Sequence, residues 1–347
     1  MKLSVIGEFG LVERIRHFLP RPSDALLGIG DDCAALRPRE GRDLLLTTDL
    51  LVEGVDFTMQ TITPFRLGRK TMAVNLSDIA AMGGLPRAAL VALALPTEMQ
   101  TEFIDQFYRG LQEEAARSGV ELIGGDLSAS PTLLIAVTLV GEVEPGRAIT
   151  RSGAKPGERI WITGRLGASG AGLMALKAGF RLRDDDRVEV PSHISAELTE
   201  AIRQAIDRHL CPVARVREGR ALAEAGVASA MIDLSDGLAS DLAHLCRESG
   251  VSARIREDRV PIDPAASAIA RYLGKDPMAL ALEAGEDFEL LFTSSSEPAE
   301  ILEMFSDGPG VTDVGEVEKS GQGCVLVQES GGVIPLTGGY NHFRRQG

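Results

Sequence analysis

The sequence predicts a mixed α/β fold of the α+β class, divided into two domains. The chain has 347 residues, which is more than one small domain needs and enough to bury two cores. Strand and helix patterns are mixed along both halves. A stretch dense in turn-forming residues, RSGAKPG at 151–157, lies between the halves. We therefore expect one domain at 1–152 and a second at 153–347.

The first half alternates helix and strand patterns. Residues 1–19 have apolar positions interrupted by charged ones, a pattern that favours an amphipathic helix over a signal peptide. Apolar runs predict strands at Leu44–Asp49, Ala88–Pro96, Val120–Asp126 and Leu133–Val143. Helical periodicity and glycine stops predict helices at Leu67–Gly83 and Glu102–Gly119.

The second half continues the mixed pattern. Strands are expected at Arg159–Gly164, Ser229–Ser235 and Phe288–Thr293. Helices are expected at Ser195–His209, Pro212–Ala225 and Leu238–Gly250. The charged stretch RLRDDDRVEVP, at 181–191, is predicted to be a solvated loop.

Composition excludes several classes of function. The net charge is −14, and no Lys/Arg-rich run offers the basic stripe that binding to nucleic acid requires. The same negative charge disfavours anionic membranes, and the most apolar window is too short to span a bilayer. The cysteines lie far apart without a CxxC pair, which predicts reduced thiols in a cytosolic protein: Cys33, Cys211, Cys246 and Cys324.

Aspartates recur where a predicted strand or turn ends and a helix is expected to begin. Ligands of open α/β sheets bind beyond the carboxyl ends of the strands. An alternative role is N-capping, which suits Asp78 and Asp236 better than the adjacent pair in GIGDDCAAL. The aspartates concerned are Asp31, Asp32, Asp49, Asp78, Asp126, Asp233 and Asp236.

A gathering of these carboxylates needs cations. Two like charges 4 Å apart repel by about 4 kcal/mol at an effective dielectric near 20. With no histidine or cysteine nearby, and with Thr47 and Thr48 beside Asp49, the oxygen ligands suit Mg²⁺ or Ca²⁺. Ligands scattered along the chain do not form an EF-hand loop, and they favour several Mg²⁺ ions that bridge to a polyphosphate.

Phosphate would be bound without a Walker A lysine, because no GxxxxGK[ST] motif occurs. Arg151, in a glycine-rich turn, is the best basic candidate for binding phosphate oxygens; an interdomain salt bridge is the alternative. No GxGxxG motif follows a strand, which argues against a dehydrogenase.

An ordered set of segments resembles the thiamine-monophosphate kinase family, part of the aminoimidazole ribonucleotide synthetase-like superfamily. The segments are GEFGLVERI, GIGDDCAAL, TTDLLVEGVDF, AVNLSDIAAMGG, LIGGDLS, ITRSGAKPGERIWITG, SAMIDLSDGLASDLAHLC, AGEDFELLFT and GYNHF. The resemblance spans almost the whole chain. It implies ATP-dependent phosphorylation of thiamine monophosphate to thiamine diphosphate. It also implies a homodimer whose N-terminal sheets pair, with an α+β C-terminal domain completing each cleft.

The resemblance also implies roles for individual residues. The metal ligands would be Asp32, Thr47, Thr48, Asp49, Asp78, Asp126, Asp233 and Asp236. The nucleotide would contact Tyr108, Gly125, Asp126, Arg151 and Ser235, of which Asp126 and Arg151 would serve catalysis. The substrate would contact Asp56, Glu286 and Tyr340. Thiazolium is a cation, so a carboxylate can offset its charge and an aromatic ring can stack on it.

Three positions depart from the family pattern. Asp56 stands where the family usually has histidine, so a group that only accepts hydrogen bonds replaces a ring that can donate and stack. Ala284 replaces the first glycine of GGED, and Phe288 replaces a tyrosine. None of these changes removes an expected metal ligand.

The expected reaction is direct in-line transfer of the ATP γ-phosphoryl group. The acceptor phosphate has a second pKa near 6 and is already ionised at neutral pH, so no general base is needed. Two alternatives remain open: another ATP-using enzyme of the same superfamily, and a protein that binds divalent ions without catalysis.

Overall fold

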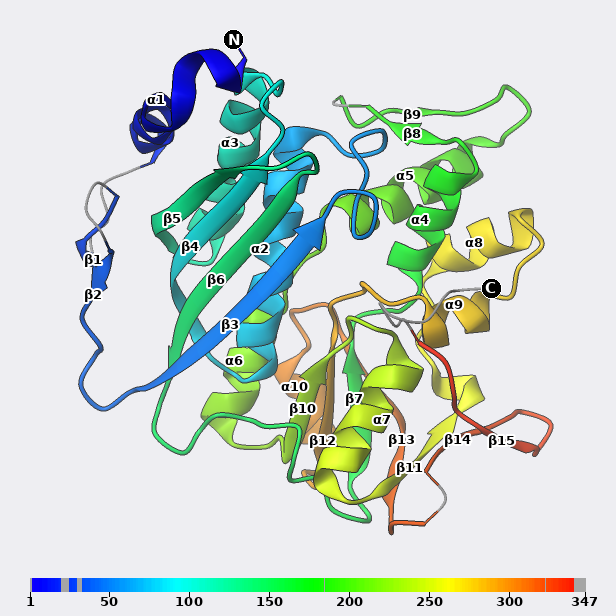
Figure 1. Ribbon diagram of the computed structural model, residues 1–347. Coiled ribbons are helices and arrows are strands. Elements are labelled where there is room, and N and C mark those ends of the chain that lie inside the picture. The colour runs from blue at the N-terminus through cyan, green and yellow to red at the C-terminus, as the bar shows by residue number, and fades with distance from the viewer. Residues whose placement is uncertain (1, 20–24, 30–32, 184, 322, 340–347) are drawn as a thin grey trace. The chain divides into compact units, whose positions relative to one another are not determined.

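The computed structural model describes residues 2–19, 25–29, 33–183, 185–321 and 323–339 (Figure 1). The chain divides into two compact units. Unit 1 comprises Met1–Ile79 and Gly84–Gly146, and unit 2 comprises Ala80–Gly83 and Arg147–Gly347. Each unit combines helices with sheets, so the predicted mixed α/β fold is confirmed. The domain boundary between 152 and 153 stays a prediction.

Unit 1 is built on a four-stranded sheet in the order β3-β6-β4-β5. Strand β6 is antiparallel to both of its neighbours, and β4 runs parallel to β5. The strands are β1 (Ala25–Leu27), β2 (Ala35–Leu36), β3 (Asp43–Val52), β4 (Leu85–Leu95), β5 (Glu121–Ala129) and β6 (Leu134–Val143). The helices are α1 (Leu3–Phe18), α2 (Pro64–Ala81) and α3 (Thr101–Arg117).

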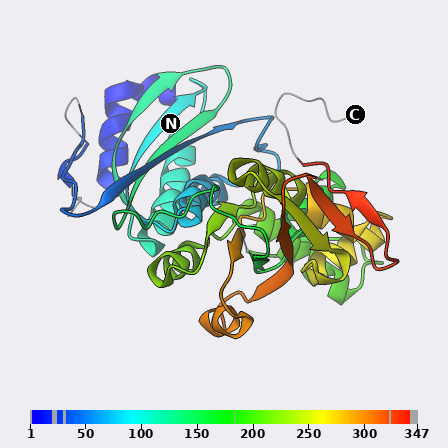
Figure 2. The same cartoon turned by 90° about the horizontal axis from the view of Figure 1, so that it is seen from below.

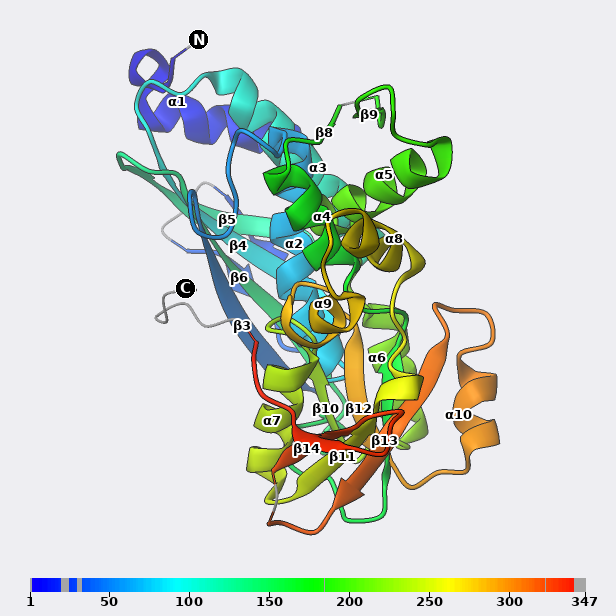
Figure 3. The same cartoon turned by 90° about the vertical axis from the view of Figure 1, so that its right-hand side faces the viewer.

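The two faces of this sheet differ in burial. Successive residues of a strand point to opposite faces. Helices α2 and α3 cover one face of the sheet (Figure 3). Leu45, Val91 and Val137 are buried on this face, which is also the face where Thr47 of β3 contacts Asp78 of α2. On the other face Leu46 is 70% exposed and Leu50 is 58% exposed. The sheet therefore has one face inside the core of unit 1, which we call the helix-covered face. Its other face carries exposed apolar side chains, and we call it the open face.

Unit 2 is built on a seven-stranded sheet in the order β10-β12-β7-β13-β11-β14-β15, with the C-terminal strands β14 and β15, in red, at one edge (Figure 2). The strands of the unit are β7 (Arg159–Thr163), β8 (Arg181–Leu182), β9 (Val188–Glu189), β10 (Ala230–Asp233), β11 (Ser252–Arg256), β12 (Leu290–Ser294), β13 (Val311–Glu318), β14 (Cys324–Val327) and β15 (Val333–Pro335). The helices are α4 (Ala168–Lys177), α5 (Ala196–Leu210), α6 (Val216–Ala225), α7 (Leu238–Ser249), α8 (Pro264–Tyr272), α9 (Pro277–Glu283) and α10 (Pro298–Met304), with the short 3₁₀ turn η1 (Glu257–Arg259).

Apolar side chains fill both sides of this sheet. One cluster joins Ile160, Ile232 and Leu291 to the buried side of α7. The other cluster contains Trp161 and Phe292, whose rings stack with centroids 6.5 Å apart. Alternate residues of the same strands supply the two clusters, so the central strands are buried on both faces.

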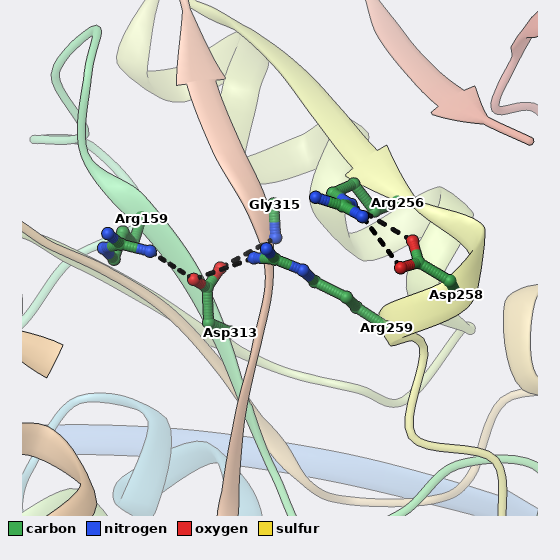
Figure 4. A network of polar contacts seen from close by, with 6 residues as sticks. All are labelled: Arg159, Arg256, Asp258, Arg259, Asp313 and Gly315. Carbon is green, nitrogen blue, oxygen red and sulfur yellow. Dashed lines mark hydrogen bonds and ion pairs between the residues drawn. The ribbon is translucent and has the colours of Figure 1, made fainter. Parts of the chain in front are cut away.

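A polar network fixes the register where β13 bulges. The pairing of β13 with β7 shifts between Asp313 and Gly315. The Asp313 carboxylate accepts from the Gly315 N–H at 3.2 Å and from Arg259 of η1 at 3.1 Å, and it also pairs with Arg159 of β7 (Figure 4). One carboxylate thus ties three segments together at the bulge.

One stretch differs from the sequence-based expectation. The stretch 181–191, expected to be a loop, contains the β8–β9 hairpin, because the Arg183 N–H bonds to the Arg187 carbonyl at 2.8 Å and closes its turn. All four cysteines are free thiols, as expected. Within the described part of the chain, no helix is both long and apolar enough to cross a bilayer.

Candidate active site

The expected placement of the aspartates at element ends is wrong for three of them. Asp49 lies inside β3, Asp78 lies inside α2 and Asp126 lies inside β5. For Asp49 and Asp126 the reason is that β3 and β5 run several residues further than their apolar segments indicate. Asp78 lies within the helix that the sequence predicts at Leu67–Gly83 and not at its start. Asp233, the last residue of β10, and Asp236, just before α7, do lie where the sequence predicts.

Thr47 and Asp78 contact each other in unit 1. The Thr47 hydroxyl, on β3, donates a hydrogen bond to the Asp78 carboxylate, on α2. Because side chains along a strand alternate between the two faces, Asp49 lies on the same helix-covered face as Thr47. Thr48 lies on the open face, where its hydroxyl is 3.4 Å from that of Thr138. The structure thus brings Thr47 and Asp78 together and places Thr48 on the other side of the sheet.

Gly125 and Asp126 lie at the opposite edge of the sheet. Asp49 pairs with Val137, Val137 with Val91, and Val91 with Gly125, so one row of residues crosses all four strands. A Cβ atom at Gly125 would lie 1.9 Å from the carbonyl oxygen of Val91, and only glycine permits this close approach. The next residue, Asp126, is exposed on the open face.

Two further residues of unit 1 have local structural partners. The Asp56 carboxylate accepts from the Val52 N–H at 2.8 Å and closes the turn after β3. The Tyr108 side chain is buried in α3, edge-on to Phe107, and burial raises the pKa of its hydroxyl. Contacts of Asp56 with substrate and of Tyr108 with nucleotide stay predictions.

In unit 2, Asp233 and Asp236 lie beside a third carboxylate that the sequence analysis did not single out. Asp241, in the first turn of α7, is buried and accepts from the Asp236 N–H at 3.0 Å. Burial, together with the charges of Asp233 and Asp236, raises the pKa of Asp241 to about 8. At neutral pH the buried Asp241 is therefore mainly protonated and adds little negative charge beside Asp233 and Asp236.

The segment after α9 is fixed against the turn that holds Ser235. The Glu286 N–H donates to the Ser235 carbonyl at 2.8 Å, and the Phe288 N–H donates to the Leu234 carbonyl at 2.9 Å. Glu286 and Phe288 have φ of 56° and 52°, in the left-handed region that side chains rarely adopt. Such backbone persists where its surroundings impose it, and it is common at functional sites.

The side chains of this segment point to different partners. The Asp287 carboxylate accepts from the N–H groups of Gly167 and Ser169, at the start of α4, and burial raises its pKa to about 7. Glu289 is buried in an ion pair with Arg215. Glu286 keeps 32% of its side chain exposed and lies 3.2 Å from Nδ1 of His209.

His209 and Ser169 are not among the site residues expected from the sequence. His209 is a single histidine on an amphipathic helix and has no motif around it. Its ring also lies 3.0 Å from the Ser169 hydroxyl, which is 40 residues away in the chain. A contact across that separation leaves no pattern in the sequence.

Arg151 lies in the turn-rich stretch before β7. Its guanidinium is exposed and forms no ion pair with the described residues of unit 2, while its carbonyl accepts from the Ser249 hydroxyl at 2.9 Å. An exposed guanidinium on a fixed backbone suits phosphate binding.

Two expected site residues, Asp32 and Tyr340, lie outside the described residues, as does Asp31. Among the residues that the structure describes, no three His, Cys, Asp or Glu side chains gather to hold a metal ion by themselves. Taken separately, the oxygens of Thr47 and Asp78 in unit 1 and those of Asp233 and Asp236 in unit 2 are of the kind that suits Mg²⁺, which protein sites typically hold through one or two carboxylates, water and substrate phosphate. The donors are therefore suited to a metal–nucleotide complex.

Comparison with known proteins gives matches along nearly the whole chain. The family model for the AIR synthase related protein N-terminal domain matches residues 30–143, and the model for its C-terminal domain matches 155–328. The chain is 36% identical to the thiamine-monophosphate kinase of Aquifex aeolicus (strain VF5), over 94% of this chain and 96% of that relative. It is 37% identical to that of Bacillus subtilis (strain 168), over 98% and 100%. A solved structure described as AaThiL complexed with AMPPCP and TMP is similar with a TM-score of 0.75 and 32% identity, over 99% of each chain.

Proposed function

This chain belongs to the thiamine-monophosphate kinase family of AIR synthase related proteins, and we propose that it transfers the γ-phosphoryl group of ATP to thiamine monophosphate. It is an enzyme of the phosphotransferase type, with a phosphate group as acceptor. The product would be thiamine diphosphate. Relatives that carry this name match over almost their full length, and a similar structure is described with an ATP analogue and TMP.

One geometric observation supports the proposal most directly. The backbone bond between Glu286 and Ser235 joins the residue expected to contact the thiamine moiety to a residue expected to contact the nucleotide. A transfer between two bound substrates requires their binding groups to be held at fixed separation. The two hydrogen bonds from this segment to the Leu234–Ser235 turn provide that fixed relation within unit 2.

The acidic and hydroxyl oxygens are proposed to bind Mg²⁺ together with the nucleotide. In unit 1 these are Thr47, Thr48, Asp49, Asp78 and Asp126; in unit 2 they are Asp233 and Asp236; Asp32 is proposed as a further ligand. Bound Mg²⁺ neutralises the charge of the phosphates. Thr47 orients the Asp78 carboxylate, Arg151 binds phosphate oxygens, and the ionised acceptor phosphate needs no general base.

We propose that the enzyme is a homodimer formed through the open face of the unit 1 sheet. Leu46 and Leu50 lie on that face, and Leu44 and Leu90 are also exposed. Contiguous apolar surface of this kind usually marks an interface. A second copy with the same face would cover it, because isologous pairing is the commonest arrangement of homo-oligomers.

The function is tested by measuring ADP formation by the full chain with ATP and Mg²⁺. We expect ADP to form only when thiamine monophosphate is added, and to stop when Mg²⁺ is chelated. Turnover with an aminoimidazole ribonucleotide precursor instead would favour another ATP-using enzyme of the superfamily. Metal binding without ADP formation on any of these substrates would favour the non-catalytic alternative.

A further inference from the structure

Glu286 is fixed through its backbone, and its carboxylate has a contact with a buried histidine. The N–H of Glu286 is bound to Ser235, and the next residues, Asp287 and Phe288, are anchored by their own partners. Its side chain is 32% exposed. A glutamate has three side-chain torsions, so a fixed backbone does not by itself fix the position of the carboxylate.

His209 constrains this carboxylate. Its side chain is only 8% exposed, and Nδ1 lies 3.2 Å from Oε2 of Glu286 and 3.0 Å from Oγ of Ser169. His209 comes from α5 and Ser169 from α4, so two packed helices hold the ring in place. A ring buried in this way has little freedom to turn away from Glu286.

The chemistry of these contacts assigns the proton to Nδ1. A carboxylate oxygen only accepts hydrogen bonds, and a hydroxyl oxygen can also accept. A proton on Nδ1 therefore satisfies the carboxylate and allows the Ser169 oxygen to share it. Hydrogen bonds to a carboxylate are charge-assisted and are stronger than neutral ones.

We propose that His209 is a positioning residue for the acceptor site: through Nδ1–H it holds the Glu286 carboxylate where that carboxylate meets the cationic ring of thiamine monophosphate. This inference rests on the proposed function, because it takes Glu286 as the contact for the thiazolium cation. His209 itself touches neither substrate in this assignment. Ser169 orients the ring from the other side.

The experiment compares His209→Leu, His209→Asn and the wild-type enzyme. His209→Leu removes the donor, and we expect the KM for thiamine monophosphate to rise about tenfold while kcat and the KM for ATP stay unchanged. The affinity for thiamine monophosphate without ATP, measured by titration calorimetry, should fall by the same factor. His209→Asn keeps an N–H near the position of Nδ1 and should restore most of the affinity. Arg208→Ala, at an exposed neighbouring position on α5, is the matched control and should change nothing.

A double-mutant cycle with Glu286→Gln decides whether His209 acts through Glu286. In the E286Q background, His209→Leu should lower the affinity for thiamine monophosphate by less than about twofold. The inference would be overturned if His209→Leu still lowered the affinity for thiamine monophosphate tenfold in the E286Q background. A His209→Leu enzyme with the wild-type KM for thiamine monophosphate would overturn it as well. If His209→Leu fails to fold, Ser169→Ala takes its place in the cycle. We then expect the KM for thiamine monophosphate to rise about threefold, and only while Glu286 is present. Absence of ADP formation by the wild type would instead contradict the proposed function.

Discussion

Asp49 and Asp126 lie on the two edge strands of the unit 1 sheet and project from its opposite faces. The row that joins Asp49 to Gly125 spans three strand-to-strand steps, which corresponds to about 14 Å between the edge backbones. Mg²⁺ binds oxygen at about 2.1 Å. One copy of unit 1 therefore cannot place both carboxylates on one ion.

The first prediction tests whether one active site uses Asp49 and Asp126 from the same copy or from two copies of the chain. If each active site takes Asp49 from one copy and Asp126 from the other, Asp49→Ala and Asp126→Ala should each abolish activity alone. After the two variants are unfolded together and refolded, half of the dimers are mixed and half of their sites are intact, which gives about a quarter of wild-type activity. Zero activity in the mixture, with mixed dimers verified by differential tags, would show that both residues act within one chain.

The second prediction concerns the open face of the same sheet. Leu46→Glu places a charge within the proposed interface and should convert the dimer to a monomer without changing helix and strand content. Light scattering after gel filtration measures the mass, and circular dichroism checks the fold. Leu302→Glu, at an exposed position on α10, is the control and should remain dimeric. A wild-type enzyme that is monomeric at all concentrations would contradict the proposed dimer.

The third prediction concerns the hydroxyl that orients Asp78. Thr47→Val keeps the shape of the side chain and removes the donor to the Asp78 carboxylate. Loss of a partner that orients a metal-binding carboxylate typically weakens metal binding by 10-fold or more, so the Mg²⁺ concentration for half-maximal activity should rise about tenfold. Thr47→Ser keeps the hydroxyl and should behave as the wild type. An unchanged Mg²⁺ requirement in Thr47→Val would remove Thr47 and Asp78 from the proposed ligands.

The order of the elements was predictable because it depends on local patterns. Apolar runs predict β3 and β6, and helical periodicity with a glycine stop predicts α3, in each case within a few residues of the observed ends. The hairpin of β8 and β9 was not predictable, because each strand has only two residues and its turn is closed by backbone groups. Backbone bonding of this kind has no side-chain signature.

The site was predictable only where its residues stand in motifs. Asp233 and Asp236 lie at the end of β10 as expected, since strand ends are marked by the change from apolar to polar residues. The separation of Asp49 from Asp126 was not predictable, because it depends on the strand order, which places β6 and β4 between them. The contact of His209 with Glu286 depends on the packing of α5, which no short segment encodes.

The fourth prediction concerns the buried ion pair next to the Glu286 segment. Nε of Arg215 lies 2.6 Å from Glu289, whose side chain is 2% exposed and also accepts from the Thr163 hydroxyl at 2.7 Å. Arg215→Met leaves a buried carboxylate without its cation, and the free energy of unfolding should fall by about 3–5 kcal/mol in urea titrations. The double variant Arg215→Met/Glu289→Met should recover much of the lost stability. Arg203→Met is the control: Arg203 forms an exposed ion pair with Glu200, and its replacement should change stability little. Equal losses from Arg215→Met and Arg203→Met would contradict the role of the buried pair.

The fifth prediction gives the pH dependence of stability that Asp287 contributes. In an unfolded chain its pKa is about 4, and burial raises the pKa of Asp287 to about 7 in the folded protein. Between these values the folded state holds a proton that the unfolded chain has released, so the stability contributed by this group falls as the pH rises from 4 to 7. Asp287→Asn cannot ionise and should therefore gain stability relative to the wild type across this range. Asp258 has the opposite shift, because the hydrogen bond from the Arg256 guanidinium lowers its pKa, so Asp258→Asn should lose stability relative to the wild type as the pH rises towards 4 and keep that deficit above it. Chemical unfolding at a series of pH values measures both differences, and a constant difference for Asp287→Asn would mean that this carboxyl titrates normally in the folded enzyme.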